Sequence, residues 1–109
     1  MKVIAAIAAT VTGLAVASGA SARPTGVMVM MHEPGCHSFF VNGKFMKKLT
    51  VRGPAKVFNY DEDALIVRGN GVRMRDRVGK YVLLRRPGVY KITMVNQEAM
   101  DYTLTLTVK

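Results

Sequence analysis

The sequence has a single cysteine, Cys36, among its 109 residues. Small secreted domains often support a thin core with disulfide bonds, but one cysteine cannot close a bridge within its own chain. Apolar residues do not recur at helical spacing, and the chain contains no internal repeat and no low-complexity segment. We therefore expect neither a disulfide scaffold nor a helical or repeat protein, and packing has to stabilise the fold unless a metal or a partner adds to it.

The sequence also lacks an apolar run long enough to span a bilayer, which takes about 20 residues. The longest run, residues 3–17, follows Lys2 and leads into Ala20-Ser21-Ala22. A positive start, an apolar region and a small-residue end are typical of a secretory signal peptide. We therefore predict that residues 1–22 are a cleaved signal and that residues 23–109 form one domain. The mature protein is expected to be periplasmic or secreted, with no transmembrane segment.

Acidic residues are few, with 7 Asp and Glu against 16 Lys and Arg. Loss of Lys2 with the signal lowers the net charge only from +9 to +8. The basic residues form no run and are not interleaved with aromatic residues, so we expect no nucleic-acid partner. An anionic lipid, a cell-wall polymer or an acidic protein is the expected class of partner, and a solvated basic surface with no partner is the alternative.

Apolar and polar residues alternate through much of the mature chain. Residues 102–108 place Tyr, Leu, Leu and Val on one face and three threonines on the other, and residues 89–95 alternate in the same way. Turn signals at Asn42-Gly43, 69–71 and Pro87-Gly88 separate further apolar runs. Eight or nine short strands at this spacing predict an all-β fold, a small antiparallel Greek-key β-sandwich.

Two segments resemble the cupredoxin family. Residues 56–61, KVFNYD, are similar to the cupredoxin strand that ends with Asn, any residue and Asp. Residues 87–94, PGVYKITM, followed by the strand at 104–109, are similar to the C-terminal cupredoxin strands. The resemblance implies a cupredoxin-like sandwich. A Gly-x-Tyr strand also occurs in immunoglobulin-like sandwiches, which are the alternative fold.

The usual blue-copper ligands do not follow from this resemblance. Such a site needs two His, a Cys thiolate and a weak axial ligand. The resemblance would place the first His near Leu65 and the Cys near Met94, and no His follows Met94. Met100 alone matches the axial methionine. The resemblance therefore implies the fold without its electron-transfer site.

Soft donor side chains are concentrated in residues 27–40, which contain both histidines and the only cysteine. Pro34-Gly35 predicts a type II turn, where the chain reverses. A strict ladder would place His32 opposite His37 and Cys36 on the other face, whereas a looser loop would gather all three. Thiolate, thioether and imidazole favour Cu(I), and imidazole also suits Zn(II). The sequence thus indicates a candidate copper or zinc site whose donors are His32, Cys36, His37, Met30 and Met31.

Structural roles explain the same residues without a metal. Methionines in an alternating strand commonly fill irregular gaps in a core. A lone cysteine is usually buried and inert, and in an oxidising compartment Cys36 could instead pair with another chain. The sequence leaves these interpretations open.

Arginines indicate a second candidate site. Arg73, Arg75 and Arg77 alternate and would project from one face of a strand, and Arg85 and Arg86 follow. This basic face could dock an anionic partner in an interaction module that has no metal, although charge that guards an exposed edge strand is the alternative. Both histidines lie beside one turn with no neighbouring Asp, so no catalytic triad is indicated and we expect a binding protein rather than an enzyme.

Overall fold

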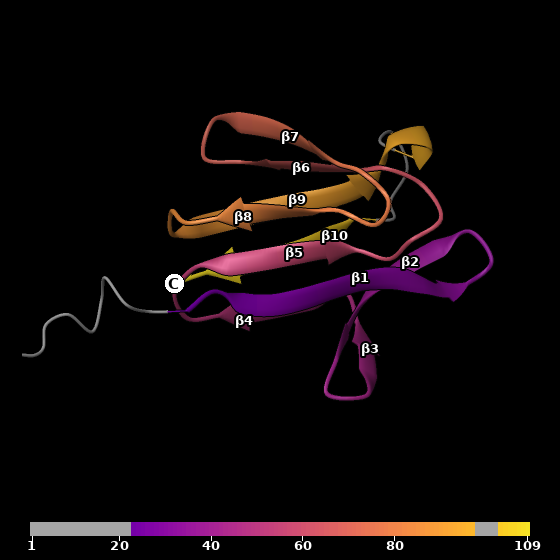
Figure 1. The fold of residues 1–109 in the computed structure, drawn as a ribbon, viewed down its shortest axis with the longest axis horizontal. Coiled ribbons are helices and arrows are strands. Elements are labelled where there is room, and N and C mark those ends of the chain that lie inside the picture. Colours follow the sequence, from indigo (N-terminus) through magenta and orange to yellow (C-terminus); the bar gives the residue numbers. More distant parts are fainter. Residues whose placement is uncertain (1–22, 98–102) are drawn as a thin grey trace, which may run out of the picture.

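The computed structural model describes residues 23–97 and 103–109, which form two five-stranded sheets packed face to face (Figure 1). The first sheet has the order β3-β2-β1-β5-β8, with β1 (Thr25–Glu33), β2 (Cys36–Val41), β3 (Lys44–Met46), β5 (Ala55–Asn59) and β8 (Tyr81–Leu84). The second has the order β4-β10-β9-β6-β7, with β4 (Lys48–Val51), β6 (Leu65–Gly69), β7 (Val72–Asp76), β9 (Gly88–Met94) and β10 (Leu104–Val108). A 3-10 turn, η2 (Val95–Gln97), follows β9. The all-β sandwich is confirmed.

The predicted signal segment, residues 1–22, lies outside the described residues. Within the described part of the chain, no helix has the length and apolar character needed to cross a membrane.

Alternating side chains from both sheets form the core. In β10 the apolar residues Leu104, Leu106 and Val108 are buried, while the threonines between them are half-buried on the other face. This is the period of two that the sequence predicts. The remaining fully buried apolar side chains from the two sheets meet those of β10, and they include Val27, Val29, Phe39, Val57, Leu65, Val67, Leu84 and Ile92.

Two Asn-Gly turns connect neighbouring strands, as their residue types require. Asn42 and Gly43 have φ of 52° and 77° between β2 and β3, and Asn70 and Gly71 have 51° and 75° between β6 and β7. Two successive positive φ values match the type I′ turn, which suits the twist of a hairpin. The turn residues therefore fix the registers of these two hairpins.

Two strand pairs are parallel, which differs from the purely antiparallel sandwich expected from the sequence. Strand β1 pairs with β5 in parallel, with Val27 opposite Val57, and β10 pairs with β4 in parallel, with Leu106 opposite Leu49. All other pairs are antiparallel. Parallel neighbours need long crossover connections, and alternation along a strand says nothing about which strand lies beside it. The mixed sheets also differ from the antiparallel sheets of an immunoglobulin-like sandwich.

The outer face of the first sheet contains an apolar row. One register row crosses all five strands of this sheet, and its members are aromatic residues and one methionine: Phe45, Phe40, Met28, Phe58 and Tyr81. The Nζ atom of Lys56 lies 4.2 Å from the centre of the Tyr81 ring, within the range of a cation–π contact. The outer face of the second sheet has a different chemistry, described below.

Candidate metal site and basic surface

The β1–β2 hairpin contains the soft donors, and its register differs by one residue from the strict ladder. Met31, not His32, lies opposite His37, and Glu33 lies opposite Cys36. The register shifts between Met31 and Glu33, so His32 is the extra residue of a bulge. Gly35 has φ of 79°, the positive value that the Pro-Gly turn requires. The predicted pairing of His32 with His37 is therefore wrong, because the bulge next to the turn absorbs one residue of β1.

His37 points into the sandwich. Its side chain is fully buried, and its Nε2 atom lies 3.5 Å from the carbonyl oxygen of Ile92 in the second sheet. Its Nδ1 atom has no hydrogen-bond partner among the described residues. Burial is the largest effect on the ring and lowers the pKa of His37 below its ordinary value of 6.5, because a charged imidazolium is poorly solvated there. His37 is therefore neutral at pH 7, the form in which imidazole binds metals.

Asp61 and Met31 lie at the same end of the sandwich as His37. Val29 pairs with Asn59, so Met31 and Asp61 each lie two residues beyond a paired position, Met31 still within β1 and Asp61 in the bend after β5. Asp61 is buried, its Oδ2 atom has no hydrogen-bond partner among the described residues, and its charge acts on the imidazole of His37. Met31 lies opposite His37 in the register and is 44% exposed. A buried imidazole and a buried carboxylate thus interact at this end of the sandwich, with an exposed thioether on the neighbouring strand.

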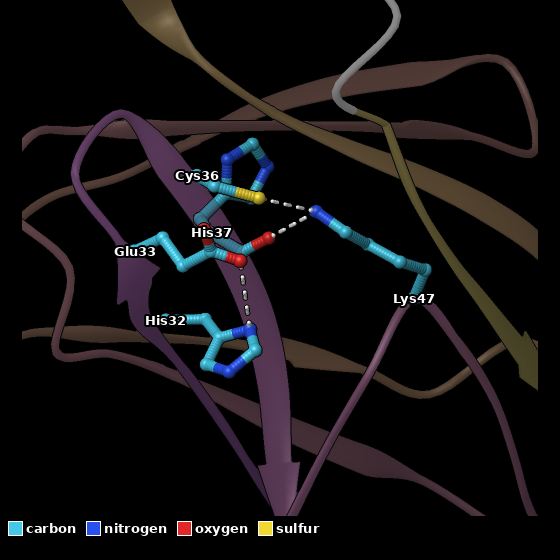
Figure 2. Close-up of polar contacts among 5 residues, drawn as sticks. All are labelled: His32, Glu33, Cys36, His37 and Lys47. Carbon is cyan, nitrogen blue, oxygen red and sulfur yellow. Dashed lines mark hydrogen bonds and ion pairs between the residues drawn. The ribbon is translucent and has the colours of Figure 1, made fainter.

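His32 lies on the opposite side of the hairpin from His37. Its ring stacks on Phe45 with the ring centres 4.3 Å apart, and its Nδ1 atom lies 4.0 Å from Oε1 of Glu33. Its side chain is 46% exposed. Figure 2 shows the two imidazole rings pointing away from each other. The hairpin therefore separates its two histidines.

Cys36 is half-buried and not bonded to another cysteine. The Nζ atom of Lys47 lies 3.0 Å from its Sγ atom and donates a second hydrogen bond, 2.7 Å long, to the carbonyl oxygen of His37 (Figure 2). A cation at the sulfur would be repelled by this ammonium group. The charge of Lys47 also acts on the buried ring of His37 and, after burial itself, is a further cause that lowers the pKa of His37.

The predicted donors are thus divided between the two faces of the hairpin. His37 faces the interior with the exposed Met31 opposite it in the register, whereas His32 and Met30 lie on the outer side, where Met30 pairs with Ser38. Across residues 23–97 and 103–109, no three His, Cys, Asp or Glu side chains are grouped as metal ligands. Asp61 belongs to the Asn-x-Asp segment that the sequence analysis noted, but its proximity to His37 was not predicted, because it depends on the parallel β1–β5 pairing.

The positions that the cupredoxin resemblance assigns to copper ligands are filled by apolar side chains. Leu65 and Met94 lie opposite each other on β6 and β9, with exposures of 0% and 5%. A leucine cannot bind a metal, so these residues do not fit a blue-copper centre. Met100 lies outside the described residues. The expected loss of the usual ligand pair is reflected in the packing, because Leu65 and Met94 belong to the hydrophobic core.

Asn59 fixes the loop after β5 from a fully buried position. Its Nδ2 atom donates to the carbonyl oxygens of Asp63 and Asp76, at 3.0 and 2.7 Å, and its Oδ1 atom accepts from the N–H of Asp61 at 2.8 Å. Three hydrogen bonds from one side chain determine the direction of the backbone at Asp61. Asn59 is thus a positioning residue for the carboxylate beside His37.

The predicted arginines do not form one surface. Arg73 and Arg75 pair with Arg68 and Ile66 on the outer face of the second sheet. Arg77 follows the end of β7, in the connection where its carbonyl oxygen accepts from the N–H of Lys80. Arg85 and Arg86 lie between β8 and β9, beside the β6–β7 turn. The alternation in the sequence correctly placed Arg73 and Arg75 on one face, but the other cations of that face come from other strands.

Comparison with known proteins returns matches to solved structures only. No protein-family model and no curated protein matches the chain. A novel purple cupredoxin from Nitrosopumilus maritimus aligns with a TM-score of 0.48 and 14% identity, over 78% of this chain and 99% of that chain. A reduced mutant of amicyanin aligns with a TM-score of 0.45 and 12% identity, over 84% of this chain and 89% of that chain. Both are cupredoxins, the family that the two strand segments resemble, and the similarity concerns the fold alone.

Proposed function

We propose that this chain is an exported, non-enzymatic binding protein that holds a copper or zinc ion at the end of the sandwich where His37 is buried. The observation that carries the proposal is the Nδ1 atom of His37, which is fully enclosed and has no hydrogen-bond partner among the described residues. Buried polar atoms are almost always paired, so an unpaired one calls for an explanation such as a bound ion or an ordered water.

Asp61 supports the same interpretation. Its Oδ2 atom is also buried without a partner in the described chain, and its negative charge acts on His37. A cation between the carboxylate and the imidazole would satisfy both atoms and offset the cost of burying the charge. Imidazole and carboxylate together suit Zn(II), and the nearby thioether of Met31 adds affinity for Cu(I).

The other predicted donors would form an alternative metal site with the same function. His32, Cys36 and Met30 would reach a shared ion only if the bulge rearranged and Lys47 moved away from Cys36. His37 would be a ligand in either arrangement. The two arrangements differ in whether binding depends on Asp61 or on Cys36.

The test is metal titration of the mature protein with Zn(II), and with Cu(I) under reducing conditions, each in competition with a chromogenic chelator. His37→Phe keeps a ring of similar size in the core and removes the donor nitrogen, and Asp61→Asn keeps the shape and removes the charge. We expect stoichiometric binding by the parent and a loss of affinity of at least about tenfold in each variant, because each removes a direct ligand. His32→Ala is the matched control and should bind like the parent.

Circular dichroism of each variant has to show the parent's strand content, so that lost binding is not lost folding. If Cys36→Ser and His32→Ala abolish binding while Asp61→Asn does not, the outer donors hold the metal. If the folded parent takes up neither metal, the proposed function is wrong and the two buried atoms are satisfied by water.

A further inference from the structure

A row of basic side chains crosses the outer face of the second sheet. Arg68 on β6 lies opposite Arg73 on β7 and opposite Lys91 on β9. Thr105 on β10 lies opposite Lys91 and opposite Lys48 on β4. The row therefore contains one residue from each of the five strands, and we call it the cationic row: Arg73, Arg68, Lys91, Thr105 and Lys48. All four cations are exposed.

Thr105, the one uncharged residue of the cationic row, does not interrupt the row. The Nζ atom of Lys91 donates a hydrogen bond of 3.1 Å to the hydroxyl oxygen of Thr105, so its ammonium leans over β10 toward Lys48. Arg75 lies on the same face one pair further along β7, opposite Ile66. The strand residues of this face that the structure describes include no Asp and no Glu. The face thus has one sign of charge.

Cations directly opposite one another destabilise a sheet, because their repulsion is not offset within the pair. Arg68 and Lys91 form such a pair. Neighbouring strands are about 4.8 Å apart, so the row extends about 19 Å in a straight line across the strands. A ligand with negative charges along one line would relieve the repulsion between Arg68 and Lys91 and reach the further cations of the row.

We propose that the cationic row binds a linear polyanion, a chain of phosphate or carboxylate groups that lies across the strands. Arginine forks bind both groups through paired N–H donors, and lysine contributes a point charge. The described residues enclose no pocket, which suits a polymer on an open surface. Four of the five cations on the strand residues described for this face follow one line, with Arg75 the exception, and this arrangement favours a polymer over a flat anionic bilayer. The inference is independent of the proposed metal function.

The test uses the mature protein with a chelator present and inorganic polyphosphate of defined chain lengths as the probe. We expect affinity to rise with chain length and to level off once the polymer spans about 19 Å, because longer chains reach no further cations of the row. The double variant Arg68→Gln with Lys91→Gln should bind at least about tenfold more weakly, with a salt slope smaller by about two, since two phosphate contacts are lost.

The matched control is Arg85→Gln with Arg86→Gln, which removes the same charge from the connection between β8 and β9. It should retain most of the affinity and the same dependence on chain length. Equal losses in the two double variants would show that only net charge matters and would overturn the proposal. Binding to anionic phospholipid vesicles with none to polyphosphate would also overturn it, in favour of a membrane surface.

Discussion

The ammonium group of Lys47 bridges Sγ of Cys36 and the carbonyl oxygen of His37, at 3.0 and 2.7 Å. Lys47 lies between β3 and β4, so this bridge joins the start of β2 to the point where the chain passes from the first sheet to the second. The local geometry of the donor stretch therefore depends on a residue ten positions away.

Replacing Lys47 with methionine should lower the free energy of unfolding by about 1 kcal/mol, because a charge-assisted hydrogen bond to a backbone carbonyl is lost while the aliphatic stem is kept. Urea unfolding measures the change. Lys44→Met on the exposed part of β3 is the control and should change stability little. An unchanged midpoint for Lys47→Met would mean that the bridge contributes nothing in solution.

Met31 and Met30 offer a matched pair for the metal proposal. Met31 lies opposite His37 in the register, whereas Met30 pairs with Ser38. Met31→Leu should weaken Cu(I) binding several-fold and leave Zn(II) binding nearly unchanged, because a thioether is a soft ligand. Met30→Leu should affect neither metal. If the two variants behave alike in chelator competition, Met31 is not a ligand.

Asp76 should make stability fall as the pH rises. Its side chain is buried, neither carboxylate oxygen has a partner among the described residues, and burial raises the pKa of Asp76 from 3.8 to about 7. Between these values the native state keeps a proton that the unfolded state has released, so stability decreases with rising pH. The contribution of Asp76 to stability is largest below the pKa of 3.8 that it has in the unfolded chain, and it is lost above pH 7.

Asp76→Asn removes this titration. The variant should be more stable than the parent at pH 8, and the difference should shrink toward pH 4, as measured by urea unfolding across that range. The lowered pKa of His37 has the opposite effect on stability. When the pH falls below the ordinary pKa of histidine, the unfolded chain takes up a proton that the native ring does not, so stability decreases as the pH falls. The comparison with the parent cancels this effect. A pH-independent difference would contradict the assignment.

Asn59→Ala should be among the most destabilising changes in the protein, costing about 3 kcal/mol, because it leaves two carbonyl oxygens and one N–H without their partner in a buried site. Asn96 is the control, since it is exposed and bonds the side chain of Asp63 alone. Asn96→Ala should cost less than about 1 kcal/mol. Thermal melts of the two variants distinguish these outcomes, and similar costs would argue against the network around Asn59.

The elements of the fold could be predicted from the sequence, whereas the neighbours of each strand could not. Alternation identified β10 and β9, and Asn-Gly pairs located two hairpins, because both signals are local. The site depended on non-local facts. Asp61 approaches His37 through a parallel pairing, and the bulge at His32 places the two histidines on opposite faces of the hairpin. Arg68 and Lys91 are 23 positions apart in the sequence and adjacent in the sheet, so only the register makes them one surface.

The position of β10 has a kinetic consequence. This strand lies between β4 and β9 and pairs with both of them, although it is the last of the strands along the chain. Its pairing with β4 joins Lys48 to Thr105, which closes a loop of more than fifty residues. Until that contact forms, β4 and β9 expose open edges. Folding should therefore be limited by a late, long-range step, and a shortened chain without β10 should aggregate before it folds.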